Sequence, residues 1–99
     1  MLLIVGTVRL PPEKLHAARP IMEEMIKASR AEVGCLAYSY SQDMLEPGLI
    51  HVNEAWQDRA TLETHFASDH LAAWRARWED LGIHDRNLNL YEAGKPSEI

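Results

Sequence analysis

The order in which the hydrophobic period changes along the chain limits its fold more than any other feature. Residues 2–10 are rich in β-branched and aliphatic residues and end at two prolines, which predicts a strand, and helical spacing follows. Two alternating segments then cover residues 35–42 and 49–57. Helical spacing returns over residues 59–81, and residues 88–93 alternate again. The predicted order is therefore strand, helix, strand, strand, broken helix, strand. This order is typical of an α+β fold, the ferredoxin-like split βαβ arrangement with an antiparallel sheet.

Proline, glycine and capping side chains mark where these elements begin and end. The marking residues are Pro12, Gly34, Gly48, Asp58, Ser68, Asp69 and Gly82. The turn Glu46-Pro47-Gly48 predicts a hairpin between the second and third strands. Pro20 lies inside the first helical segment, and it either kinks that helix or begins its main part. The sequence leaves both alternatives open.

The spacing of apolar residues predicts which side chains share a face. On the first helix these are Leu15, Ala18, Met22, Met25, Ile26 and Ser29, and on the last helical segment Leu71, Trp74, Trp78 and Leu81. In the second strand they are Leu36, Tyr38 and Tyr40, and in the third strand Ile50, Val52, Glu54 and Trp56. The helix over residues 59–67 is expected to bury Leu62 and Phe66, with His65 at the margin of that face.

Length and composition predict one domain that gains from a partner. The 99 residues, 46% hydrophobic and 25% charged, are expected to form a single domain over residues 1–99 with a polar tail at residues 94–99. So short a chain builds only a modest core. Helices cover one face of the predicted sheet, and the other face carries too many apolar residues to be left to water. We therefore expect a homodimer that joins two sheets.

The charge balance argues against two classes of partner. The chain has 10 Lys and Arg against 15 Asp and Glu, and the cations are scattered. It lacks the basic stripe that nucleic acid requires, and the same balance argues against an anionic membrane surface. No segment approaches the ~20 apolar residues of a membrane span. The single cysteine, Cys35, cannot form an internal disulfide, so a cytoplasmic location is expected.

Motifs that would hold a cofactor or a metal are missing from the sequence. Gly6 stands alone in the first strand, so no glycine-rich loop is available to hold a nucleotide. There is no Cys-x-x-Cys or His-Glu-x-x-His pattern. The histidines are scattered, and His65 and His70 are separated by a helix break. We therefore expect neither a cofactor nor a metal site.

One stretch combines several unusual residues and carries a family resemblance. Glu54, Trp56, Leu62, His65, His70 and Leu71 follow the order Glu-x-Trp, Leu, His, and then His beside a hydrophobic residue. This order resembles the antibiotic biosynthesis monooxygenase (ABM) family of the dimeric α+β barrel superfamily. The step Gly34-Cys35-x-x-Tyr38 and the predicted strand order agree with the same family, so the resemblance extends over nearly the whole chain.

The resemblance implies a ferredoxin-like protomer, a homodimer whose two sheets form an α+β barrel, and a pocket between sheet and helices. Activities in the family differ: some members oxygenate polycyclic phenols or quinols with dioxygen and no cofactor, relatives degrade haem, and others isomerise small metabolites. Haem-degrading relatives use an asparagine on the first strand and a histidine in the last helix. Here the first strand has no asparagine, and Arg75 or a neighbour stands near the place of that histidine. Both departures argue against haem degradation.

A cofactor-free oxygenase needs a base and a pocket that keeps an aromatic substrate away from water. His65 is the candidate base, and His70 is a second candidate kept neutral by the N-terminus of its helix. Glu54 lies on an apolar strand face, so it is either paired, with Arg9 as the candidate partner, or a titrating group of the site. The candidate pocket walls are Tyr38, Tyr40, Trp56, Phe66 and Trp74. The alternative is that the aromatic residues only pack the core and that the two histidines have structural roles.

The leading hypothesis is a homodimeric monooxygenase of the ABM type that oxidises an electron-rich phenol or quinol with dioxygen. A first alternative is an isomerase or tautomerase that shuttles protons with the same histidines. A second is a non-catalytic module that binds small molecules or dimerises. A cavity of about 300 Å³ or more touching His65 would favour a catalytic interpretation.

Overall fold

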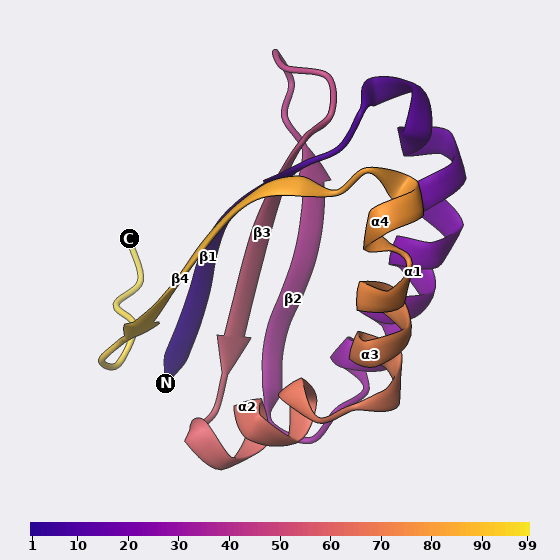
Figure 1. Ribbon diagram of the computed structural model, residues 1–99. Coiled ribbons are helices and arrows are strands. Elements are labelled where there is room, and N and C mark those ends of the chain that lie inside the picture. The colour runs from indigo at the N-terminus through magenta and orange to yellow at the C-terminus, as the bar shows by residue number, and fades with distance from the viewer.

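The computed structural model describes residues 1–99 and contains a four-stranded antiparallel sheet with helices along one side (Figure 1). Its elements are β1 (Leu2–Arg9), the 3-10 turn η1 (Pro12–Lys14), α1 (Leu15–Arg30), β2 (Cys35–Gln42), β3 (Leu49–Trp56), α2 (Arg59–Phe66), α3 (Asp69–Ala76), α4 (Trp78–Leu81) and β4 (His84–Glu92). The strands lie in the order β2-β3-β1-β4, and every neighbouring pair is antiparallel. The predicted ferredoxin-like α+β fold is confirmed.

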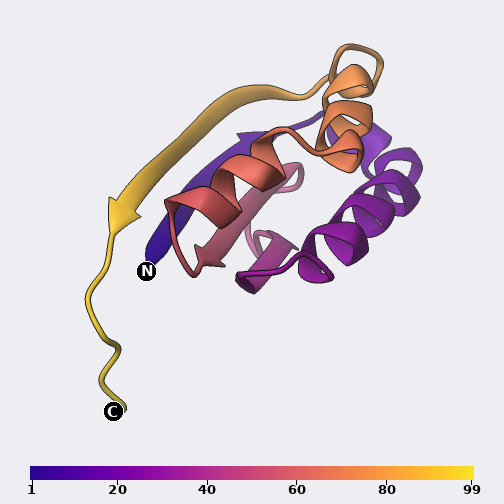
Figure 2. The ribbon, with the colours of Figure 1, turned by 90° about the horizontal axis from the view of Figure 1, so that it is seen from below.

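The core lies between the helices and one face of the sheet (Figure 2). The two central strands bury alternate residues, namely Leu2, Ile4 and Val8 from β1 and Ile50, Val52, Glu54 and Trp56 from β3. α1 buries Ala18, Met22, Met25 and Ser29 at the predicted helical spacing. The opposite face of the sheet has no helix over it.

α1 runs without interruption through Pro20, so the alternative in which the helix begins at Pro20 is excluded. The chain enters this helix through η1, with Pro12 in the first turn, where its missing N–H costs no hydrogen bond. At 16 residues, α1 is the longest helix of the fold. None of the helices has the length and apolar character needed to cross a membrane.

A bulge at the start of β2 changes which side chains face the core. The register against β3 shifts between Cys35 and Ala37, so Leu36 is the extra residue. Leu36 is 58% exposed, whereas Tyr38 is buried and Tyr40 packs against the core. The predicted common face is therefore right for the two tyrosines and wrong for Leu36, because strict alternation fails at the bulge.

Side-chain caps begin α2 and α3 where the sequence predicted them. The Asp58 carboxylate accepts the N–H of Thr61 at 2.9 Å, and the Thr61 hydroxyl accepts the N–H of Asp58 at 3.4 Å. Ser68 Oγ accepts the N–H of Leu71 at 3.3 Å and donates to the carbonyl of His65 at 2.6 Å. The chain therefore turns directly after His65, and the next helix starts beside the end of the previous one.

β4 begins at His84, earlier than the alternating segment at residues 88–93 that predicted it. It is an edge strand that pairs only with β1, and most of its side chains are exposed on both faces. This exposure explains why its first polar residues did not reveal a strand in the sequence. The early start places Arg86 opposite the helices, where it becomes part of the site described below.

Gly6 lets β4 lie close to β1, which generates a first prediction. A Cβ atom at residue 6 would lie 1.8 Å from the carbonyl oxygen of Asn87. We expect Gly6→Ala to lower the free energy of unfolding by about 1–3 kcal/mol, the usual cost of overpacking. Urea denaturation followed by circular dichroism measures this change. Gly94→Ala is the matched control, because a Cβ atom there has no neighbour within 4 Å. Equal stability of the two variants would contradict the prediction.

Candidate functional site

His65 lies in the last turn of α2 and is almost completely buried. His65 is 1% exposed, whereas the neighbouring Phe66 is 43% exposed. The sequence predicted the reverse, with Phe66 on the buried face and His65 at the margin. In this short helix Leu62 and His65, three residues apart, form the buried stripe, and Phe66 is rotated about 100° further round the helix.

Aromatic rings surround the imidazole of His65. The indole of Trp56 lies with its ring centroid 4.6 Å from that of His65, and the phenol of Tyr38 lies edge-on at 5.4 Å. Burial among these rings disfavours the charged imidazolium and lowers the pKa of His65. The neighbouring Glu32 carboxylate opposes this effect without cancelling it. The ring is therefore neutral near neutral pH.

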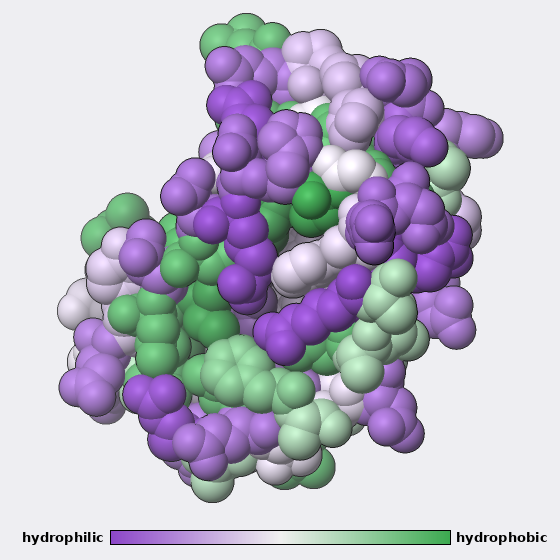
Figure 3. Space-filling model, viewed as in Figure 1, coloured by the Kyte–Doolittle hydropathy of each residue, from purple (hydrophilic) through white to green (hydrophobic).

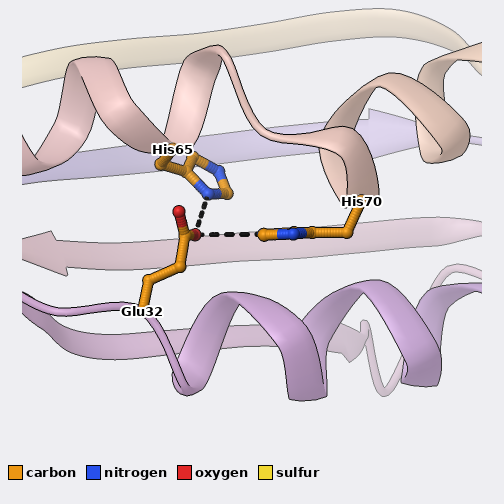
Figure 4. A group of neighbouring side chains, drawn as sticks. All are labelled: Glu32, His65 and His70. Atoms are coloured by element: carbon orange, nitrogen blue, oxygen red, sulfur yellow. Dashed lines mark hydrogen bonds and ion pairs between the residues drawn. The ribbon is translucent and has the colours of Figure 1, made fainter.

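Glu32 bonds to both histidines of the site, although no pattern in the sequence predicted it. Its Oε2 lies 2.6 Å from Nδ1 of His65 and 3.1 Å from Nε2 of His70 (Figure 4). The predicted helix break does lie between His65 and His70, but the turn between α2 and α3 nevertheless directs both rings toward this carboxylate. Glu32 lies in the turn between α1 and β2, and no motif in the sequence links it to His65.

The carboxylate of Glu32 determines how the protons of His65 are distributed. A carboxylate only accepts hydrogen bonds, so Nδ1 of His65 carries the proton and Nε2 is left as an acceptor. Nε2 is the nitrogen nearer to Glu54, whose Oε1 lies 4.0 Å away. This is the arrangement of a histidine base whose orientation is fixed from behind by an acid.

Glu54 is a buried carboxyl group without a cationic partner. Its Oε1 accepts the indole N–H of Trp56 at 3.0 Å, and burial raises the pKa of Glu54. The predicted pair with Arg9 is wrong: Arg9 contacts Glu46 at 3.2 Å and Asp85 at 3.9 Å instead. Register explains the error, since Glu54 lies opposite Ile4, on the helix-facing side of the sheet, whereas Arg9 belongs to the other side.

A cavity of about 160 Å³ lies between the sheet and the helices, beside His65. The space-filling view shows hydrophobic residues gathered between β4 and the helical layer (Figure 3). Of the predicted site residues, the cavity is lined by Tyr38, Tyr40, Glu54, His65, Phe66 and Trp74. Trp56 lies against His65 without lining the cavity, and His70 lies on the far side of Glu32. The cavity touches His65, but its volume is smaller than the ~300 Å³ that was expected to favour a catalytic interpretation, so that expectation is wrong and the volume alone does not favour catalysis.

Glu32, His65 and His70 also form a donor set for a metal ion. One carboxylate oxygen and two imidazole nitrogens lie within 4.8 Å of one another. Two histidines and one carboxylate are a ligand set used by zinc and by non-haem iron. The same atoms already satisfy one another as hydrogen-bond partners, so the cluster is complete as an orienting network for His65.

Comparison with known proteins identifies the family. The sequence pattern of the family described as antibiotic biosynthesis monooxygenase (ABM) matches residues 1–77. The chain belongs to the ABM family. The matched span contains the whole Glu32, His65 and His70 cluster and confirms the resemblance inferred from the sequence. Membership indicates a monooxygenase-like or small-molecule-binding function.

Solved structures and a curated relative agree with this assignment. A crystal structure from Deinococcus radiodurans, described as a candidate antibiotic biosynthesis monooxygenase, is 28% identical, covers 100% of this chain and 98% of its own, and has a TM-score of 0.92. A Pseudomonas aeruginosa protein is 27% identical over 97% of this chain and 94% of its own, with a TM-score of 0.78. An uncharacterised Synechocystis protein is 25% identical over 99% of this chain and 67% of its own length.

The buried carboxyl of Glu54 generates a prediction about pH and stability. Its pKa is raised above the ordinary value of 4.5, so on raising the pH the unfolded chain loses this proton first. The free energy of unfolding of the wild type therefore decreases as the pH rises from about 4.5 through the higher pKa of Glu54 in the folded protein. Glu54→Gln cannot ionise, and we expect its melting temperature, relative to wild type, to be higher at about pH 8 than at about pH 4.

Thermal unfolding of both proteins at the two pH values measures this difference. Glu63→Gln is the matched control, because Glu63 is an exposed carboxylate of α2. If the difference in melting temperature between Glu54→Gln and wild type is the same at both pH values, the raised pKa of Glu54 does not affect stability.

Proposed function

We propose that this protein oxidises an electron-rich phenol or quinol with dioxygen and without a cofactor. One observation carries the proposal: His65 lines the cavity with Nδ1 bonded to Glu32 and Nε2 left free on the side of Glu54. A neutral imidazole held in this way is a positioned general base. The cavity of about 160 Å³ suits a substrate with one aromatic ring, since a cavity of about 150 Å³ holds benzene.

The first chemical step is removal of a proton from a substrate hydroxyl. His65 Nε2 accepts this proton while Nδ1–H stays donated to Glu32, whose negative charge stabilises the imidazolium that forms. The low pKa of His65 keeps the base unprotonated before the step. Glu32 lies away from the cavity and acts as a positioning residue, and His70 acts through Glu32 in the same way.

The second step is electron transfer from the substrate anion to dioxygen. The radical and the superoxide then join as a peroxide on the ring. Loss of water from the peroxide of a quinol leaves a hydroxyquinone, so one oxygen atom enters the product and the other leaves as water. The quinol supplies all the electrons that dioxygen accepts, and no other reductant is needed.

Glu54 is placed to return a proton during loss of water. Burial raises the pKa of this carboxyl, so it keeps a proton at a pH at which an exposed glutamate has lost it. Burial also raises the pKa of the Tyr38 hydroxyl, which therefore stays neutral as part of the wall. A neutral base and a carboxylic acid thus face the same cavity.

The same pair favours a second candidate, a tautomerase or isomerase. His65 Nε2 and Glu54 Oε1 are 4.0 Å apart, which suits removal of a proton from one atom of a substrate and its delivery to a neighbouring atom. Such an enzyme turns over without consuming oxygen. A non-catalytic binding module would use the cavity and show no turnover at all.

We also propose that the working form is a cytoplasmic homodimer whose two uncovered sheet faces meet. Leu3 pairs with Ala55 on one side and with Tyr91 on the other, which places an apolar row across the uncovered face. Val5 on the same face is 41% exposed. The free thiol of Cys35 suits a reducing compartment.

Loss of the proposed base should abolish oxidation. We expect His65→Gln to lower kcat by about 10²–10⁴, the usual contribution of a general base. An oxygen electrode measures the rate with 1,4-dihydroxybenzene in air-saturated buffer against an enzyme-free blank, and chromatography of the substrate measures turnover in anaerobic buffer. His16→Gln is the matched control, because His16 is exposed on α1 and lies outside this cavity. Wild-type turnover that continues without oxygen would replace this function by the isomerase candidate.

Glu32→Gln tests the positioning role separately. The Glu32 carboxylate raises the pKa of His65, so removing its charge lowers that pKa further. Activity requires the unprotonated ring, so we expect the acidic limb of the pH–rate profile to move to lower pH while kcat falls. A role in folding alone would leave the position of this limb unchanged.

The homodimer predicts that a charge on the uncovered face disrupts assembly. We expect Val5→Glu to shift the protein from dimer to monomer, because the buried face of a partner cannot solvate a carboxylate. Sedimentation velocity at micromolar concentration measures the change. Val33→Glu is the control, since Val33 is 86% exposed in the turn before β2. A wild-type protein that sediments as a monomer would refute the dimer.

A further inference from the structure

Two arginines of the cavity wall have no anionic partner. Arg75 comes from α3 and Arg86 from β4, and neither forms an ion pair; Arg30 and Arg59 also lack a carboxylate partner, but only Arg75 and Arg86 line this cavity. The chain carries more acidic than basic residues, so partners are not scarce. Two unpaired cations at one cavity therefore need an explanation.

The two guanidinium groups are held over the same indole ring. Cζ of Arg75 lies 5.9 Å and Cζ of Arg86 lies 5.4 Å from the centroid of Trp78, both within the range of a cation–π contact. Stacking on one ring brings two like charges together, which costs free energy unless an anion lies between them. The positive charges of both arginines also act on Glu54: each of them lowers the pKa of Glu54 and so opposes the effect of burial.

Two buried N–H donors at the same place also lack partners. Nε1 of Trp74 and Nε1 of Trp78 are buried and form no well-directed hydrogen bond within the protein, and the Tyr40 hydroxyl is the polar group nearest in effect to Trp74. Both indoles line the cavity. An indole nitrogen can only donate, and an unsatisfied buried donor costs about 1–3 kcal/mol. The wall therefore combines two guanidinium groups without an anionic partner and two indole N–H groups without a hydrogen-bond partner.

We propose that this part of the cavity is an anion subsite, in which Arg75, Arg86 and the indole N–H groups of Trp74 and Trp78 bind the carboxylate of a single-ring aromatic acid. Guanidinium groups bind carboxylates through paired N–H donors, and indole N–H groups satisfy the remaining lone pairs. Glu54 is the one acidic residue in the cavity wall, and its raised pKa limits repulsion of such an anion.

The subsite specifies the substrate of the proposed oxidation, and for the identity of the reaction it rests on that proposal. Because Arg75, Arg86 and His65 line the same cavity, we expect a ring held by its carboxylate at the arginines to present a hydroxyl group at another ring position to His65. The substrate class is then a hydroxylated benzoic acid. The cavity of about 160 Å³ leaves room for one ring with small substituents, which excludes a polycyclic skeleton.

Binding of benzoate and benzamide to the full chain tests the subsite without any reaction. The two compounds have the same shape and differ in charge, and quenching of tryptophan fluorescence together with calorimetry gives both dissociation constants. We expect benzoate to bind at least about tenfold more tightly, the effect of hydrogen bonds to a charged group. Equal affinities, or no binding of either compound at millimolar concentration, would overturn the proposal. Tighter binding of phenyl phosphate than of benzoate would overturn the choice of a carboxylate.

Arginine variants locate the effect. Arg75→Gln and Arg86→Gln should each remove most of the preference for benzoate and leave benzamide binding unchanged, and Arg86→Lys should restore part of it. Both arginines are exposed, so the variants are expected to fold, which circular dichroism verifies. Arg59→Gln on α2 is the matched control, because Arg59 is exposed and does not line the cavity. An unchanged preference in the Arg75→Gln/Arg86→Gln double variant would contradict the assignment.

Oxygen consumption separates this proposal from the proposed reaction. We expect 2,5-dihydroxybenzoate to be oxidised with a higher kcat/KM than 1,4-dihydroxybenzene, and the difference to disappear in Arg86→Gln. A preference for benzoate without oxidation of either quinol would refute the reaction and support the subsite. Oxidation of both quinols with equal kcat/KM would refute the subsite and support the reaction.

Discussion

The hydrogen bond between Glu32 and His65 is the contact on which the rest of the site depends. At 2.6 Å it joins the turn after α1 to the end of α2, and it satisfies a ring that is almost completely removed from water. A buried imidazole without this partner would leave a polar nitrogen unpaired. The carboxylate also decides which nitrogen carries the proton, so one contact contributes both to packing and to the chemistry of the free nitrogen.

The core and the site share side chains. Trp56 is fully buried, packs its indole against the ring of His65 and donates its N–H to Glu54. Tyr38 likewise closes the core and forms a cavity wall. The sequence allows either a packing role for the aromatic residues or a role in the site. For Trp56 and Tyr38 these are two aspects of one position, so a large change at either residue is expected to reduce stability together with ligand binding.

Local patterns were sufficient to predict the fold. The order of elements along the chain, the hairpin and the caps at Asp58 and Ser68 depend on residues close together in the sequence, and all of them are confirmed. Errors arose wherever the answer depended on how distant elements meet. The partner of Arg9 depends on which face of β1 adjoins the helices, and the exposure of Leu36 depends on a bulge. Glu32 had no signal, because its role arises only when the turn before β2 packs against α2.

The separation of Glu32 and His65 along the chain has a consequence for how reactivity arises during folding. The β2–β3 hairpin lies between these two residues, so the proposed base is not oriented until the hairpin has formed and both helical segments have docked on it. An incompletely folded chain has no fixed tautomer at His65 and no formed cavity beside it. Orientation of the base thus coincides with completion of the fold, and partly folded chains would not generate a reactive substrate anion in the presence of oxygen.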